Sequence, residues 1–83
     1  MNQAIQVIDG FTYIASKEAI VIEVIAGGQV LPCYIGGKDQ QVLSSLYKSK
    51  QFEIEELIEV SITQDKVNAE GEVWLTVDQV ESF

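Results

Sequence analysis

The stretch EAIVIEVIAGGQVLPCYI, residues 18–35, decides the fold of this chain. Two segments rich in β-branched and other apolar residues flank the pair Gly27-Gly28. Because glycine readily adopts the positive φ of a two-residue hairpin turn, this pattern predicts two antiparallel strands joined by a tight turn.

The turn also predicts how the two strands pair, because side chains alternate between the faces of a sheet. One face receives the apolar set, in the pairs Ala26 with Gln29, Val24 with Leu31, Ile22 with Cys33, and Ile20 with Ile35. The other face receives Val21 with Tyr34, Glu23 with Pro32, and Ile25 with Val30. This second face is more apolar than a solvated face. Either a terminal segment of the chain covers it, or it forms a dimer interface or a partner groove.

The residues before this hairpin predict further short antiparallel strands, which form a meander. Segments 4–8 and 11–15 flank Asp9-Gly10, a dipeptide typical of hairpin turns, and Ser16-Lys17 is expected to form the next turn. Pro32 has no N–H to donate to a ladder, so its strand lies at an edge or directs this position outward.

After Gly36-Gly37 the apolar period changes from two to about 3.6, which predicts two consecutive helices. Asp39 is expected to cap the first helix, which ends near Lys48 and has an apolar stripe of Val42, Leu43, Leu46 and Tyr47. Ser49 is expected to cap the second helix, whose inward face contains Ile54, Leu57, Ile58, Ser61 and Ile62. Asn68 and Gly71 supply the stop and the turn that follow.

Residues 72–77 predict a final strand, with Val73, Leu75 and Val77 on one face and Trp74 and Thr76 on the other. Residues 78–83 are expected to form a tail that Val80 and Phe83 pin to an apolar surface. The predicted fold is a single α+β domain spanning residues 1–83. It combines an antiparallel β-meander, with its hairpin at Gly27-Gly28, two consecutive helices packed on one face, and a final strand returning to the sheet.

The composition argues against most catalytic and metal-binding sites. The 83 residues include no His, no Arg and one Cys, with 13 acidic side chains against five lysines. Cys33 lies in a predicted strand without a His or a basic neighbour, so we expect a core residue and not a nucleophile. The glycine pairs lack the spacing of a phosphate-binding loop. We therefore expect no enzymatic activity, no catalytic residue, no cofactor and no metal ligand.

Charge, hydropathy and the single Cys predict the cellular compartment of the protein and exclude some classes of partner. The net charge of −8 repels phosphate backbones, so direct binding to nucleic acid is not expected. No signal-peptide pattern opens the sequence, and no apolar run reaches the ~20 residues that span a membrane. A lone Cys is typical of a reducing compartment, so we expect a cytoplasmic protein without a membrane partner.

Two groups of residues are candidates for contact with a partner protein. Glu53, Glu56 and Glu59 place carboxylates along the second predicted helix, although such a surface is ordinarily only solvated. Tyr34 and Trp74 are large aromatic residues of the predicted sheet, although such residues ordinarily pack within the domain. As contacts, the acidic group would attract a basic surface, and the aromatic pair would anchor an interface.

Four segments carry a family resemblance: residues 1–5, Gly28 with 33–35, residues 52–56, and residues 71–75. Together they resemble the short proteobacterial proteins of the domain of unknown function 1488 (DUF1488) family over nearly the whole chain. The activity of that family is unknown, so the resemblance implies a fold and a bacterial setting and no mechanism.

The sequence therefore predicts a non-enzymatic protein-interaction or regulatory accessory module. Its partner is an unidentified protein or, in a homodimer, a second copy of the chain. One alternative is an acidic decoy or inhibitor of a basic nucleic-acid-binding protein, since the chain is strongly acidic. The other alternative is a small-ligand-binding domain.

Overall fold

A computed structural model describes residues 5–82 of the protein. Along the chain, its elements are β1 (Ile5–Val7), β2 (Thr12–Ile14), the short 3-10 helix η1 (Ala15–Lys17), β3 (Ala19–Ala26), β4 (Gln29–Gly36), α1 (Gln40–Ser49), α2 (Gln51–Thr63), β5 (Val73–Thr76) and α3 (Val77–Glu81). The predicted α+β class is confirmed.

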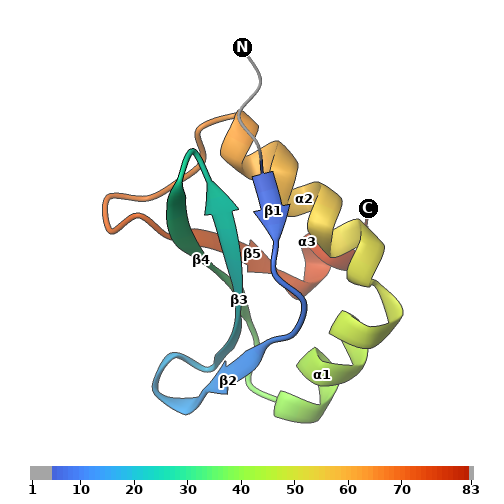
Figure 1. The fold of residues 1–83 in the computed structure, drawn as a ribbon. Helices are drawn as coiled ribbons and strands as arrows, with labels where there is room; N and C mark the ends of the chain where they lie inside the picture. The colour runs from blue at the N-terminus through green and yellow to red at the C-terminus, as the bar shows by residue number, and fades with distance from the viewer. Residues whose placement is uncertain (1–4, 83) are drawn as a thin grey trace.

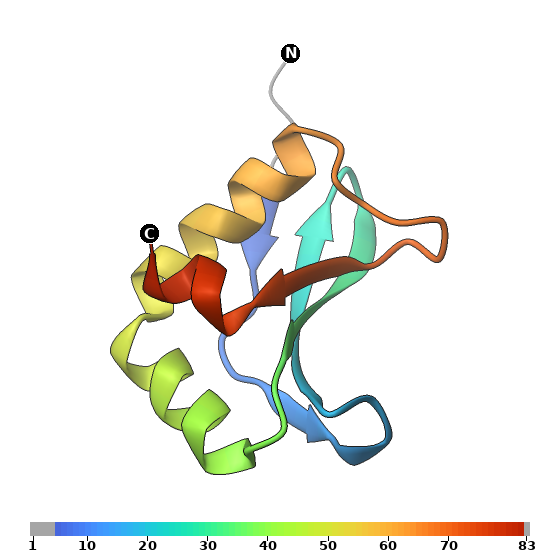
Figure 2. The same cartoon turned by 180° about the vertical axis from the view of Figure 1, so that it is seen from behind.

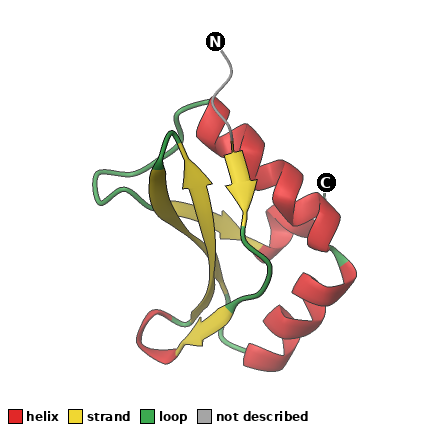
Figure 3. Ribbon diagram, viewed as in Figure 1, coloured by secondary structure: helices red, strands yellow, loops and turns green. Residues whose placement is uncertain are grey.

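The five strands form one sheet in the order β1-β3-β4-β5, and β2 also pairs with β3. Helices α1, α2 and α3 gather on one side of this sheet, while in the described part of the chain the other side carries no α-helix (Figures 1 and 3). Seen from behind, β5 leads directly into α3, which lies beside α2 (Figure 2). The predicted packing of consecutive helices on one face is confirmed.

The hairpin of β3 and β4 has the predicted register. Gly27 and Gly28 have φ values of 58° and 78°, which a two-residue turn of this kind requires. All seven predicted cross-strand pairs are present, from Ala26 with Gln29 at the turn to Ile20 with Ile35 near the other end. The apolar face of this hairpin packs against the helices and forms the core with Leu43, Leu46, Tyr47, Ile54, Ile58, Val73, Leu75 and Val80.

The final strand returns to the sheet parallel to β4, with Cys33 opposite Val73 and Ile35 opposite Leu75. Parallel neighbours need a long connection, and α1 and α2 supply it here. Pro32 precedes the first residue of β4 that pairs with β5. Its missing N–H therefore falls on a stretch of β4 that, among the described residues, pairs with β3 alone.

The predicted hairpin at Asp9-Gly10 is wrong. β1 and β2 do not pair with each other; both pair antiparallel with β3, Val7 opposite Val24 and Thr12 opposite Val21. The eight-residue β3 offers an edge long enough for both short strands. Gly10 still has a positive φ of 101°, but it serves a detour between two collinear strands and not a reversal of the chain.

Two details of the helices also differ from the prediction. Asp39 caps α1 as expected, accepting from the backbone N–H groups of Gln41 at 2.9 Å and Val42 at 3.3 Å. Val42, however, is 51% exposed and lies outside the buried stripe. Ser49 does not cap α2, because its hydroxyl donates to the carbonyl of Leu46 in α1. The N-cap position of α2 is Lys50, which forms no side-chain cap.

The C-terminal segment predicted to be a tail is a short helix. Thr76 and Gln79 form a capping box, in which the Thr76 hydroxyl accepts from the Gln79 N–H and the Gln79 side chain accepts from the Thr76 N–H. Val80 is fully buried, so the predicted pinning of this segment by Val80 is confirmed. Phe83 and residues 1–4 lie outside the described residues.

Candidate functional site

The side of the sheet that faces away from the helices is called the open face here. Strand alternation places Ile14, Val21, Glu23, Val30, Pro32, Tyr34 and Trp74 on it. This is the second face of the hairpin, whose apolar character the sequence indicated. Trp74 is 43% exposed and Val30 is 59% exposed, so the described residues cover this face only in part.

An aromatic pair on β4 and the edge strand β5 lies on the open face. The rings of Tyr34 and Trp74 stack with their centroids 4.6 Å apart and their planes inclined by 19°. The Lys17 ammonium also lies 5.3 Å from the centroid of the Tyr34 ring. As a result Tyr34 is only 8% exposed, and Trp74 forms the accessible surface of the pair. The predicted packing of Trp74 within the domain therefore applies to only part of its surface.

Hydrogen bonds hold Trp74 in place. Its Nε1–H donates to Glu72 Oε1 at 2.9 Å, and Asn68 Nδ2 donates to the same oxygen at 3.3 Å. Asn68 is itself fixed by the turn, because its Oδ1 accepts from the backbone N–H groups of Glu70 and Glu72. The bond from Trp74, then that from Asn68 and the charge of Lys17 lower the pKa of Glu72. The Trp74 indole is thus held in one orientation before any partner binds.

A hollow lies beside this pair on the open face, at the detour between β1 and β2. Four residues, 8–11, connect Val7 to Thr12, whereas only two residues of β3 separate the partners of these positions. The excess chain turns toward the helices, where the Gly10 N–H donates to the Tyr47 hydroxyl at 2.9 Å and the Phe11 ring lies 4.8 Å from the Tyr47 ring. The sheet surface is left indented at this point.

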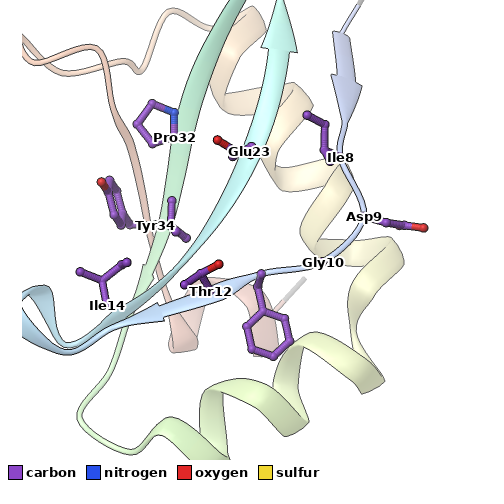
Figure 4. A pocket seen from close by; sticks show the side chains of 10 residues that line it. Ile8, Asp9, Gly10, Thr12, Ile14, Glu23, Pro32 and Tyr34 are labelled. Atoms are coloured by element: carbon purple, nitrogen blue, oxygen red, sulfur yellow. The ribbon is translucent and has the colours of Figure 1, made fainter.

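The hollow has a volume of about 590 Å³ and is lined by Ile8, Asp9, Gly10, Phe11, Thr12, Ile14, Val21, Glu23, Pro32 and Tyr34. Figure 4 shows Glu23 between Pro32 of β4 and Ile8 of the detour. Asp9 is directed away from the hollow in this view, and its Oδ1 accepts from Gln51 of α2 at 2.9 Å. Glu23 is therefore the carboxylate that is available to an occupant.

A solved structure shares this architecture. The chain is similar to a protein of unknown function from the DUF1488 family of Shewanella loihica PV-4, whose crystal structure was determined at 1.60 Å resolution. The two chains are 29% identical, the similarity covers 90% of this chain and 94% of the other, and the TM-score is 0.76. The chain has a DUF1488-like fold. No family model and no curated protein matches it.

The DUF1488-like fold separates the residues that the sequence selected as partner contacts. Tyr34 and Trp74 are brought together on the open face. Glu53, Glu56 and Glu59 lie on α2, in the helix layer, with Glu53 partly buried and the other two exposed. The predicted contact residues therefore belong to two different surfaces and do not form one site.

Neither the hollow beside Glu23 nor the role of Glu72 was predicted from the sequence. One signal for the hollow was present, since the register placed Glu23 as a lone carboxylate among apolar residues of the second face. The detour that forms the hollow gave no signal, because Asp9-Gly10 has the composition of a hairpin turn. Glu72 was assigned only to the beginning of the last strand.

The DUF1488-like domain gives Cys33 the surroundings of a structural residue. Cys33 is fully buried in β4, and burial raises the pKa of its thiol to about 12. Within residues 5–82, no three His, Cys, Asp or Glu side chains are grouped so that they could hold a metal ion. No helix among these residues has the length and apolar character needed to cross a membrane.

Proposed function

We propose that this chain is a non-enzymatic protein-interaction module that binds a basic partner protein through its open face. The observation that carries the proposal is the Trp74 side chain, which is 43% exposed on the open face and oriented by the Tyr34 stack and the Glu72 hydrogen bond. A large aromatic that is ordered before binding loses little conformational entropy in a complex, and such residues dominate binding energy at interfaces.

The chemistry of the partner follows from charge. The chain carries a net charge of −8, and Glu23 and Glu72 lie within and beside the open face. Complementary potentials accelerate association, and like charges oppose it. A basic protein is therefore a better occupant than a second copy, which would bring an equally acidic surface against this one. The proposal includes a cytoplasmic location and no direct contact with nucleic acid, for the reasons of composition given above.

The test compares two exposed aromatic residues on opposite layers. Tagged wild-type protein, Trp74→Ser and Phe52→Ser are used to capture partners from a proteobacterial lysate, with washes at about 50 and 200 mM salt. Phe52 is the matched control, because it is 70% exposed on α2. We expect a protein retained by the wild type and by Phe52→Ser in both washes and lost with Trp74→Ser, since removal of an aromatic anchor costs about 30-fold or more in affinity. Circular dichroism establishes that both variants are folded.

Other outcomes contradict the proposal. A partner lost with Phe52→Ser and retained by Trp74→Ser would place the interface on the helix layer. A partner that both variants retain at low salt and that dissociates at the higher salt would favour the acidic decoy, with Glu53, Glu56 and Glu59 as its contacts, because screening weakens interactions between exposed charges. A concentration-dependent dimer in analytical ultracentrifugation, abolished by Trp74→Ser, would identify a second copy as the occupant.

The hollow beside Glu23 supports a small-ligand-binding domain as a second candidate. Its volume of about 590 Å³ lies in the range of ~300–1,000 Å³ that is usual for ligand pockets. A ligand that binds the folded state raises the melting temperature by mass action. A thermal-shift screen of metabolites tests this candidate: a concentration-dependent rise that Glu23→Gln abolishes would support it, and the absence of any such rise would count against it.

A further inference from the structure

We propose that the hollow beside Glu23 binds a lysine or arginine side chain of the partner protein. This inference rests on the proposed function, because it names the chemical group that the open face recognises. The hollow would then select the partner through its basic side chain, whereas Trp74 would contribute an aromatic contact that does not depend on that side chain.

The shape of the hollow suits a long side chain with a polar end. Its walls combine polar groups with apolar side chains, among them Ile8 of the detour, Val21 of β3 and Pro32 of β4. Lysine and arginine carry an apolar stem below a charged head, and they bury the stem while the head keeps polar partners. The stem of such a residue fits these walls, and its head reaches the carboxylate of Glu23.

The charges of the hollow select a cation. Its ten lining residues include two acids and no lysine. Asp9 is directed away and accepts from Gln51 at 2.9 Å, which leaves Glu23 as the charged group available to an occupant. Thr12, an exposed residue, also lines the hollow, and its hydroxyl is able to accept a hydrogen bond from an ammonium or guanidinium group. An anion would find a like charge here, and a purely apolar group would leave the carboxylate without a partner.

Lys17 places a positive charge near the hollow, and its removal should affect cation binding in the direction opposite to the removal of Glu23. Its ammonium lies 5.3 Å from the centroid of the Tyr34 ring, and Tyr34 lines the hollow. A cation bound beside Glu23 is repelled by this ammonium, although water screens the repulsion. Removal of the Lys17 charge should therefore strengthen binding, whereas removal of the Glu23 charge should weaken it.

The experiment measures binding of side-chain analogues to the whole 83-residue chain by ¹⁵N NMR. The probes are n-butylguanidinium and n-butylammonium, and N-butylurea is the neutral control of similar shape. The proteins are wild type, Glu23→Gln, Lys17→Met and the matched control Glu56→Gln, which removes one exposed carboxylate from the helix layer.

We expect both cations to shift the backbone amide signals of Thr12, Val21 and Glu23 with millimolar affinity. Glu23→Gln should weaken this binding about fivefold, the equivalent of one ion pair about 4 Å apart in water. Lys17→Met should strengthen it about twofold, and Glu56→Gln should leave it unchanged. Equal shifts with N-butylurea, or equal losses with Glu23→Gln and Glu56→Gln, would overturn the inference, because the hollow would then not recognise charge.

The same variants distinguish failure of this inference from failure of the proposed function. In the capture experiment, loss of the partner with both Trp74→Ser and Glu23→Gln supports both proposals. Loss with Trp74→Ser alone leaves the proposed function intact and overturns the inference. If neither substitution affects capture while n-butylguanidinium still binds beside Glu23, the occupant is a free cationic molecule and the inference is overturned together with the proposed function.

Discussion

Cys33 should be almost inert toward thiol reagents in the folded protein. Its side chain is fully buried, and burial raises the pKa of the thiol from 9.0 to about 12. At pH 8 the thiolate fraction is then about a thousandfold below that of an ordinary thiol, and only the thiolate attacks disulfide reagents. Access also requires the chain to open. A stability of ~0.05–0.15 kcal/mol per residue gives about 4–12 kcal/mol here, so the open population is about one in a thousand or less.

The assay is the reaction with 5,5′-dithiobis(2-nitrobenzoate) at pH 8, followed in buffer and in 6 M guanidinium chloride. The chain has a single Cys, so the signal comes from Cys33 alone. We expect reaction in buffer to be at least about a thousandfold slower than in denaturant. Glutathione under both conditions corrects for the effect of denaturant on the reagent. A rate in buffer within tenfold of the denatured rate would refute this reasoning and restore Cys33 as a candidate nucleophile.

Three further predictions concern Glu72, Val80 and Gly10. The pKa of Glu72 is lower in the folded protein than its ordinary value of 4.5, so its carboxylate stabilises the fold fully above pH 4.5, and this contribution is lost as the pH falls through the folded-state pKa. The fluorescence of Trp74, the only Trp, should report this transition, and Glu72→Gln should remove it. Val80→Ala deletes two fully buried methyl groups and should cost about 2 kcal/mol and about 10 °C in Tm, whereas Val60→Ala, at a site 43% exposed, should cost less than about 0.5 kcal/mol. Gly10→Ala should cost about 1–2 kcal/mol in urea unfolding, because φ is 101° and an added Cβ meets nothing within 4 Å, so the loss comes from the backbone alone; an unchanged midpoint would contradict this.

The central hairpin could be predicted in full because local rules determine it. A two-residue turn at Gly27-Gly28 sets one register, and a shift by one residue would turn every apolar side chain of the strand to the wrong face. The cap at Asp39 was predictable for a similar reason, since a side-chain oxygen before an apolar helical stripe satisfies the first N–H groups. Where the interactions that determine a structure lie within a short segment, the sequence is sufficient to predict that structure.

The predictions were wrong where contacts with residues outside the expected turn or cap determine the local structure. Asp9-Gly10 has the composition of a hairpin turn, but the long edge of β3 pairs with the strands on both sides of it. Ser49 has the composition of a cap, yet its hydroxyl bonds back into α1. The short helix α3 differs from these cases, because Thr76 and Gln79 have the spacing of a capping box, which is a local signal for a helix.

The position of the aromatic pair could be predicted from the sequence, whereas the hollow beside Glu23 could not. Alternation along β4 and β5 is enough to place Tyr34 and Trp74 on the face opposite the core. The hollow beside Glu23 instead depends on two extra residues that leave the sheet for contacts with α1 and α2. A detour of this kind is set by the helix layer, while its effect is a recess on the other side of the sheet. The contacts of Gly10 and Asp9 with the helices therefore shape the surface on which we propose that the partner binds, and substitutions that break these contacts should alter recognition by changing the shape of the hollow.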